Sequence, residues 1–148
     1  WLSTVMVKPG RKLKSVIYPG DLEIGHSWTY LPDLGETVAR LLDRENALGR
    51  FESFHFAGHD LGRGGEMIDA FRQAVGREEL AVRALPWSLV ALASPFVETL
   101  REVREMRYLW QMPVRLNNHK LRAFLGEEPH TPLDEAVAAT LAGMGCLP

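Results

Sequence analysis

Three residues at alternating positions, His26, Trp28 and Tyr30, form a dense group of side chains that could do chemistry. Because side chains alternate across an extended chain, all three project from one face. Further along, Trp87 and Arg107 add an aromatic ring and a cation. Aromatic faces combined with one or two cations suit a polar ligand that carries a ring or a phosphate. We therefore predict a substrate-binding site for a small molecule made of these five residues.

The competing interpretation of the same side chains is structural. Tryptophans usually belong to a core and arginines usually lie on the surface. We expect Trp110 to be a core residue on this ground, whereas for His26 and Tyr30 both interpretations stay open.

A glycine-rich segment, residues 58–65, lies between an aromatic stretch and a helical pattern. Its glycines are Gly58, Gly62, Gly64 and Gly65, in the spacing G-x-x-x-G-x-G-G. Dinucleotide phosphates are commonly held by a glycine turn between a strand and a helix, but with the spacing G-x-G-x-x-G. Asp60 also puts a negative charge where a pyrophosphate would lie. We therefore expect a plain strand-to-helix turn here.

Other kinds of site have little support in the sequence. His55 and His59 are four residues apart, but we place one on a strand and the other in a loop, whereas metal ligands at that spacing need a helix. The carboxylate pairs 78–79 and 127–128 lie beside turns, where we expect them to be solvated. We accordingly assign no catalytic, cofactor-binding or metal-ligating residue to this chain.

The composition bounds the class of protein. The chain has 148 residues, 46% of them hydrophobic and 24% charged, which suits one globular domain with a core. A net charge of −2 gives no reason to expect nucleic acid or an anionic membrane as a partner. No apolar run is long enough to span a bilayer. The single cysteine, Cys146, rules out an internal disulfide, and we predict a cytoplasmic location.

Periodicity places the site candidates on alternating strands and helices up to residue 85. Strands are expected over 13–18, 26–30, 51–57 and 80–85, and helices over 32–42 and 66–75. The remainder is mainly helical, with helices over 87–93, 96–110 and 117–125 and a last one capped by Thr131. The chain thus divides into an α/β part, residues 1–85, and a mainly helical lobe, residues 86–148.

Two apolar stripes at helical spacing predict buried helix faces. The first comprises Leu34, Val38, Leu41 and Leu42, and the second comprises Leu100, Val103, Met106 and Trp110.

Several segments together resemble the NAD-dependent epimerases and dehydratases, which are extended short-chain dehydrogenases/reductases. HSWTYLPDLGETVARLL (26–42) resembles that family's R-D-[FW]-x-Y-V-x-D-x-A segment. FESFHFAG (51–58) and EMIDAFRQAVG (66–76) resemble the strand and helix that follow it. VRLNNHKLRAFLGEEPHTPLDEAVAATL (114–141) resembles the closing signature, with its Lys, Leu-Gly, Pro-x-Thr and capped helix. The match runs in order over about residues 13–145.

The resemblance implies the C-terminal portion of a Rossmann-type enzyme, with a few short strands and a mainly helical substrate lobe. The family's dinucleotide glycines and its Tyr-x-x-x-Lys pair would lie upstream of Trp1. NAD or NADP would therefore bind the full-length parent and not this chain alone. The implied substrate is a sugar or a nucleotide-sugar.

Two positions of the family pattern bear on that substrate. His26 stands where nucleotide-sugar members carry an arginine that grips a phosphate, and a neutral imidazole is a weaker phosphate clamp. Asp33 matches the aspartate of the motif, where we expect it to cap a helix and position the preceding strand.

A function of another class fits the same sequence. The chain would then be a stand-alone module that binds a ligand or oligomerises and has no catalysis of its own. A homo-oligomer is an option in either case, because two copies can cover each other's strand edges.

Overall fold

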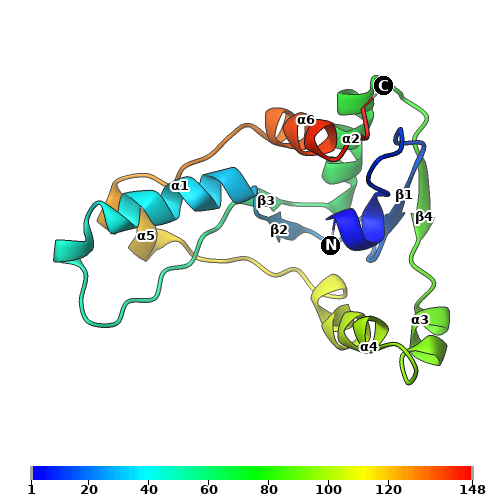
Figure 1. Ribbon diagram of the computed structural model, residues 1–148, viewed down its shortest axis with the longest axis horizontal. Coiled ribbons are helices and arrows are strands. Elements are labelled where there is room, and N and C mark those ends of the chain that lie inside the picture. The colour runs from blue at the N-terminus through cyan, green and yellow to red at the C-terminus, as the bar shows by residue number, and fades with distance from the viewer. Residues whose placement is uncertain (1, 148) are drawn as a thin grey trace.

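The computed structural model describes residues 2–147 and is a mixed α/β structure with few, short strands. The predicted α/β part begins at Trp1 and the predicted helical lobe ends at Pro148, and these two residues lie outside the described range. The elements in chain order are a π-helical turn η1 (Leu2–Met6), β1 (Ser15–Tyr18), β2 (His26–Trp28), α1 (Leu31–Leu42), a 3-10 turn η2 (Glu45–Ala47), β3 (His59–Leu61), α2 (Gly64–Val75), β4 (Ala81–Ala84), α3 (Trp87–Ala93), α4 (Glu98–Glu105), a 3-10 helix η3 (Met106–Trp110), α5 (His119–Leu125) and α6 (Leu133–Gly143). Figure 1 shows β1, β4, α2 and α6 gathered on the right, with α1 and α5 extending to the left and α3 and α4 extending below as two arms.

The strands form two small sheets. β1 and β4 run parallel, in register from Ser15 opposite Ala81 to Tyr18 opposite Ala84. A parallel pair needs a crossover connection, and α2 lies within it. β2 and β3 are antiparallel, and His26 of β2 also bridges Val114. The predicted strands around β1, β2 and β4 are therefore confirmed, each a little shorter than expected.

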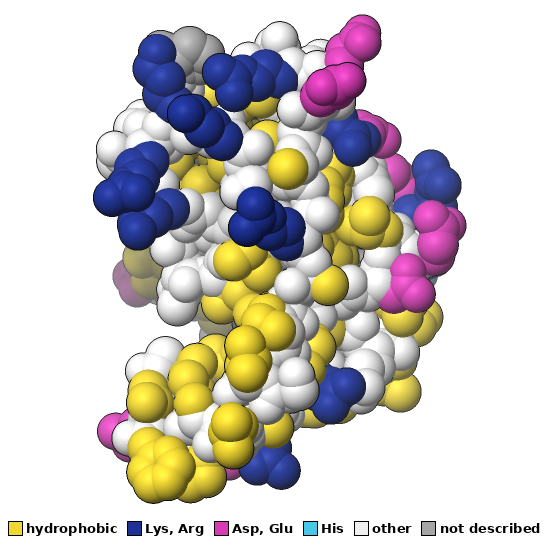
Figure 2. Space-filling model, turned by 90° about the vertical axis from the view of Figure 1, so that its right-hand side faces the viewer, with side chains coloured by type: hydrophobic (Ala, Val, Ile, Leu, Met, Phe, Trp, Pro, Cys, Tyr) yellow, Lys and Arg dark blue, Asp and Glu magenta, His cyan; other side chains and the backbone are white. Residues whose placement is uncertain are grey.

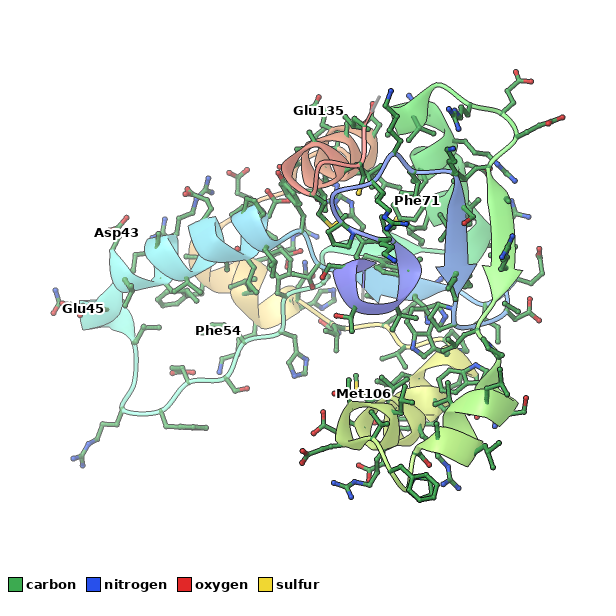
Figure 3. All side chains as sticks on the ribbon, turned by 45° about the vertical axis from the view of Figure 1, so that its right-hand side comes forward. Asp43, Glu45, Phe54, Phe71, Met106 and Glu135 are labelled. Atoms are coloured by element: carbon green, nitrogen blue, oxygen red, sulfur yellow. The ribbon has the colours of Figure 1, made fainter. Side chains whose placement is uncertain are left out.

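The core lies between β1, α2 and α6. Its fully buried members are Met6, Val16, Tyr18, Ile68, Phe71, Leu141 and Cys146. Figure 3 shows Phe71 among the side chains gathered between α2 and β1. α6 packs along α2, so a helix of the predicted helical lobe shares a core with the α/β part. Whether residue 85 separates two domains stays a prediction.

The predicted strand over residues 51–57 is wrong. The segment has no strand partner, and the strand in this region is β3, which lies inside the glycine-rich segment. Its last backbone groups are satisfied by a side chain, since the N–H groups of Ala57 and Gly58 donate to the Glu128 carboxylate at 3.0 and 2.9 Å. Because these backbone N–H groups already have a hydrogen-bond partner, the extended stretch does not need to pair with a strand.

The helical elements after residue 95 also differ from expectation. The predicted helix over 96–110 is divided into α4 and η3. Of the predicted second stripe, Trp110 is buried, Leu100 and Val103 are half-buried, and Met106 is exposed. Thr131 does not cap α6, because Pro132 holds that position and the Thr131 side chain is used elsewhere.

Helix α1 buries only part of the predicted stripe, since Leu34 and Leu41 are half-buried. Val38 and Leu42 of the predicted buried stripe are 49% and 62% exposed, and Leu31 on the same side is 73% exposed. The buried residues of the helix are Asp33 and Thr37. The helix thus turns polar residues inward and leaves an apolar stripe open.

Polar contacts explain why the polar face of α1 is turned inward. Arg40 donates to Glu127 at 3.0 Å, and Arg44 donates to the carbonyl of Phe124 at 2.6 Å. These partners lie at the end of α5 and in the segment that follows, so the polar face of α1 must be turned toward them.

Among residues 2–147, none of the helices combines the length and the apolar character that crossing a bilayer would require.

One glycine contact gives a stability prediction. A Cβ added at Gly64, the first residue of α2, would collide with the hydroxyl of the buried Tyr18. We expect Gly64→Ala to lower the free energy of unfolding by about 1–3 kcal/mol through overpacking. The matched control is Gly35→Ala on α1, where an added Cβ meets nothing, and there we expect a gain of about 0.4–1 kcal/mol. Urea denaturation measures both, and equal effects at the two sites would contradict the packing described.

Candidate functional site

A pocket of about 410 Å³ opens between the turn that follows β1 and the helix η3. It is lined by Pro19, Gly20, Asp21, Ile24, Ala84, Leu85, Trp87, Arg107, Trp110 and Gln111. Its volume lies within the range usual for small-molecule sites, toward the low end. Two of the five predicted site residues, Trp87 and Arg107, are among the lining residues.

Trp87 and Arg107 hold each other in place at this pocket. The indole Nε1 of Trp87 donates to the carbonyl of Pro19 at 2.7 Å, which fixes the ring against the turn. The guanidinium carbon of Arg107 lies 5.4 Å from the centroid of that ring, within the range of a cation–π contact. Within residues 2–147, no carboxylate lies at ion-pair distance from Arg107. Its N–H donors therefore stay available to a ligand.

Trp110 separates this pocket from the other predicted site residues. Its ring meets those of His26, Trp28 and Tyr18 edge-on, at centroid distances of 4.8, 5.8 and 5.6 Å. Trp110 is buried, as expected for a core residue, yet it also lines the pocket. His26 and Trp28 consequently support the back of the pocket wall and are not among its lining residues.

His26 is poorly suited to grip a phosphate. Its side chain is buried, and loss of solvation lowers its pKa below the usual histidine value. The ring is then neutral at pH 7 and offers no positive charge. Tyr30 does not line the pocket either; it precedes α1, where its carbonyl accepts from Leu34 at 3.2 Å.

The sequence did not single out the polar residues Asp21 and Gln111 at the pocket. The Pro19–Gly20 turn directly after a strand was the available signal, since such turns often carry ligand contacts. Gly20 also allows close packing here, because an added Cβ would lie 3.0 Å from the carbonyl oxygen of Trp110.

The glycine-rich segment forms a turn whose first helical donors are already used. Gly64 and Gly65 donate their N–H groups to the carbonyls of Ile24 and Leu22, each at 3.0 Å. The N–H of Arg63 donates to the Glu66 carboxylate at 2.9 Å. A phosphate at a helix N-terminus depends on free N–H groups, so these three donors are not available to one.

A polar cluster joins β3, α1 and the segment before α6, and its members Asp33 and His59 are buried. Asp33 accepts two hydrogen bonds from Thr131, from the backbone N–H at 2.8 Å and from the hydroxyl at 2.6 Å. The rings of His59 and His130 lie 4.5 Å apart. Burial lowers the pKa of His59, the nearby His130 lowers it further, and Asp33 opposes both effects.

Glu128 corrects the expectation that the pair 127–128 is solvated. Its carboxylate accepts from Asn118 Nδ2 at 2.9 Å as well as from the two backbone N–H groups of Ala57 and Gly58. It is therefore a structural anchor, whereas Glu127 is exposed and pairs with Arg40. Within the described part of the chain, no group of three or more His, Cys, Asp or Glu residues is arranged to hold a metal ion.

No protein-family model, curated protein or solved structure matches this chain.

The Asp33–Thr131 contact gives a prediction for stability. Thr131→Val removes the hydroxyl that donates to Asp33 and leaves one oxygen of a buried carboxylate without that bond. We expect a loss of about 1.5–3 kcal/mol in the free energy of unfolding, as for hydrogen bonds to charged groups. Thr29→Val is the control, because Thr29 is exposed, and its effect should stay within about 0.5 kcal/mol. A change of that small size at Thr131 would contradict the role given to the contact.

The buried histidines predict a pH dependence of stability. His26 and His59 have folded pKa values below the usual one, so the unfolded chain binds protons that the folded chain does not. Their contribution to stability is complete above the unfolded pKa of about 6.5 and is lost as the pH falls through the folded values. We expect Tm to fall with pH below that point, and His59→Gln to flatten the profile. His55→Gln, at an exposed histidine, should keep the wild-type slope; equal slopes in all three proteins would contradict the prediction.

Proposed function

We propose that this chain is the C-terminal, substrate-binding segment of an NAD(P)-dependent epimerase, dehydratase or reductase of the extended short-chain dehydrogenase type. In the parent enzyme, a hydride would pass between the nicotinamide and a hydroxyl or ketone of the substrate. The dinucleotide glycines and the Tyr-x-x-x-Lys pair would come from upstream polypeptide. This chain would supply walls of the substrate pocket, with Trp87 and Arg107 at the ligand and His26, Trp28 and Tyr30 behind or beside them.

The observation that carries the proposal is the pair of hydrogen bonds between Asp33 and Thr131. Asp33 is the aspartate of the segment that resembles the family's aromatic-strand motif, and Thr131 belongs to the Pro-x-Thr of the closing signature. The two residues are 98 positions apart, yet both oxygens of the carboxylate accept from Thr131. Two segments that separately resemble family motifs are thus in contact through Asp33 and Thr131, which supports the proposal.

The open apolar surfaces are a second support. Leu31, Val38 and Leu42 lie on the exposed face of α1, and Phe96, beyond α3, is 87% exposed. Figure 2 shows hydrophobic side chains gathered over the α3–α4 end of the molecule. Exposed apolar patches of this kind commonly mark a surface that another polypeptide covers. Under this proposal, the dinucleotide-binding half of the parent enzyme would be that cover.

The alternative, a stand-alone module that oligomerises, would cover the same surfaces with a second copy. Sedimentation at several protein concentrations separates the two. A monomer at all concentrations favours the segment of a larger enzyme, whereas a stable homodimer favours the module.

The main test is dinucleotide binding by the isolated chain. Since the donors at Gly64, Gly65 and Arg63 are engaged internally, we expect no heat of binding when NAD⁺, NADH or NADP⁺ is titrated into the 148-residue chain in a calorimeter. Micromolar binding of any of these would contradict the proposal. The coding sequence upstream of Trp1 is the independent check, because the proposal requires it to encode a glycine-rich first strand and a Tyr-x-x-x-Lys pair.

A further inference from the structure

The pocket between the Pro19–Gly20 turn and η3 carries a particular set of hydrogen-bonding groups. Among its lining residues, Asp21 is the carboxylate and Arg107 is the cation, and Gln111 adds an amide. A carboxylate only accepts hydrogen bonds, a guanidinium only donates them, and an amide does both. A ligand that satisfies all three must therefore offer donors as well as acceptors.

Hydroxyl groups meet this requirement and phosphates do not. A hydroxyl donates one hydrogen bond and accepts others, so neighbouring hydroxyls of one ring can serve Asp21 and Arg107 together. The phosphate oxygens of a nucleoside diphosphate carry negative charge and only accept. They would suit Arg107 but would be repelled by Asp21.

The charge balance of the site points the same way. The positive charge of Arg107 is offset by the negative charge of Asp21 on the same pocket. Among residues 2–147, Arg107 is the only cationic side chain that lines the pocket, and His26 is buried behind Trp110. A diphosphate commonly needs several cationic or N–H donors, and the N–H groups of Gly64 and Gly65 are already bonded to carbonyls.

The apolar walls of the pocket suit the C–H faces of a saturated ring. Trp87 is fixed by its hydrogen bond to Pro19, and Trp110 is held by its edge contacts with other rings. Apolar side chains of this kind attract the C–H groups of a saturated ring through dispersion. Asp21 is likewise held, since its Oδ1 accepts from the N–H of Glu23 at 2.9 Å.

We propose that this pocket takes an uncharged, polyhydroxylated ring such as a hexopyranoside in preference to a nucleotide diphosphate sugar. The inference rests on the proposed function, because it names the substrate class of the same site. It predicts that the parent enzyme acts on a free or simply substituted sugar-like ring.

The test uses the indole N–H signals of the tryptophans in ¹H–¹⁵N spectra of the full chain. The probes are the methyl pyranosides of glucose, galactose and mannose, compared with uridine diphosphate glucose. We expect at least one methyl pyranoside to shift the Trp87 and Trp110 signals saturably, with Kd of about 1–10 mM, which corresponds to a weak single-ring contact. Trp28 does not line the pocket, so its signal should move less. Uridine diphosphate glucose should bind no more tightly than that pyranoside.

A charge-neutralising variant sharpens the comparison. Asp21→Asn removes the acceptor charge, so we expect it to weaken pyranoside binding at least threefold and to strengthen binding of uridine diphosphate glucose. Asp43→Asn is the matched control, at an exposed aspartate after α1, and should change neither affinity.

Two outcomes would overturn the inference. One is tighter binding of uridine diphosphate glucose than of every methyl pyranoside; the other is the absence of a saturable Trp87 shift with all three pyranosides. Either result leaves the calorimetric test of the proposed function untouched, because that test concerns dinucleotides. Dinucleotide binding, conversely, would overturn the proposed function without bearing on the preference of this pocket.

Discussion

The arm formed by α1 and α5 depends on one constraint, the buried carboxylate of Asp33. It lies at the start of α1 and accepts two hydrogen bonds from Thr131, just before α6 enters the core. Hydrogen bonds to a charged group contribute about 1.5–3 kcal/mol each, and a buried carboxylate that lost them would be costly. Two further polar contacts of α1 join the same arm, from Arg40 to Glu127 and from Arg44 to the carbonyl of Phe124.

This anchoring has a consequence for the outer surface. With its polar residues turned toward α5 and the segment before α6, α1 presents Leu31, Val38 and Leu42 outward. A helix in a completed domain usually does the reverse and buries its apolar stripe. The parallel β1–β4 pair is similar, because parallel sheets are normally covered on both faces and rarely stop at two strands. Both features support the proposal that this chain packs against further polypeptide.

Local signals in the sequence were sufficient where the nearest neighbours decide the structure. The apolar spacing and the glycine stop at Gly76 predicted α2, and the turn at Pro19–Gly20 marked the end of β1. Which face of a helix is buried depends on partners distant in sequence. The predicted stripe on α1 was therefore only partly right: Leu34 and Leu41 are half-buried, and Val38 and Leu42 are exposed. The strand over 51–57 failed for the same reason, because Glu128 takes the place of a neighbouring strand. At the pocket, residue type was sufficient to predict Trp87 and Arg107. Asp21 and Gln111 were not predicted, because they come together only when η3 is folded against the turn.

Native-state hydrogen exchange of the Thr131 amide tests the central claim most directly, because that N–H donates to Asp33 and to nothing in a helix or sheet. If Asp33 anchors the arm to the core, the Thr131 amide should exchange within about tenfold of the amide of Phe71 in the core helix α2. Exchange at close to the rate of an unprotected peptide, while Phe71 stays protected, would contradict the account.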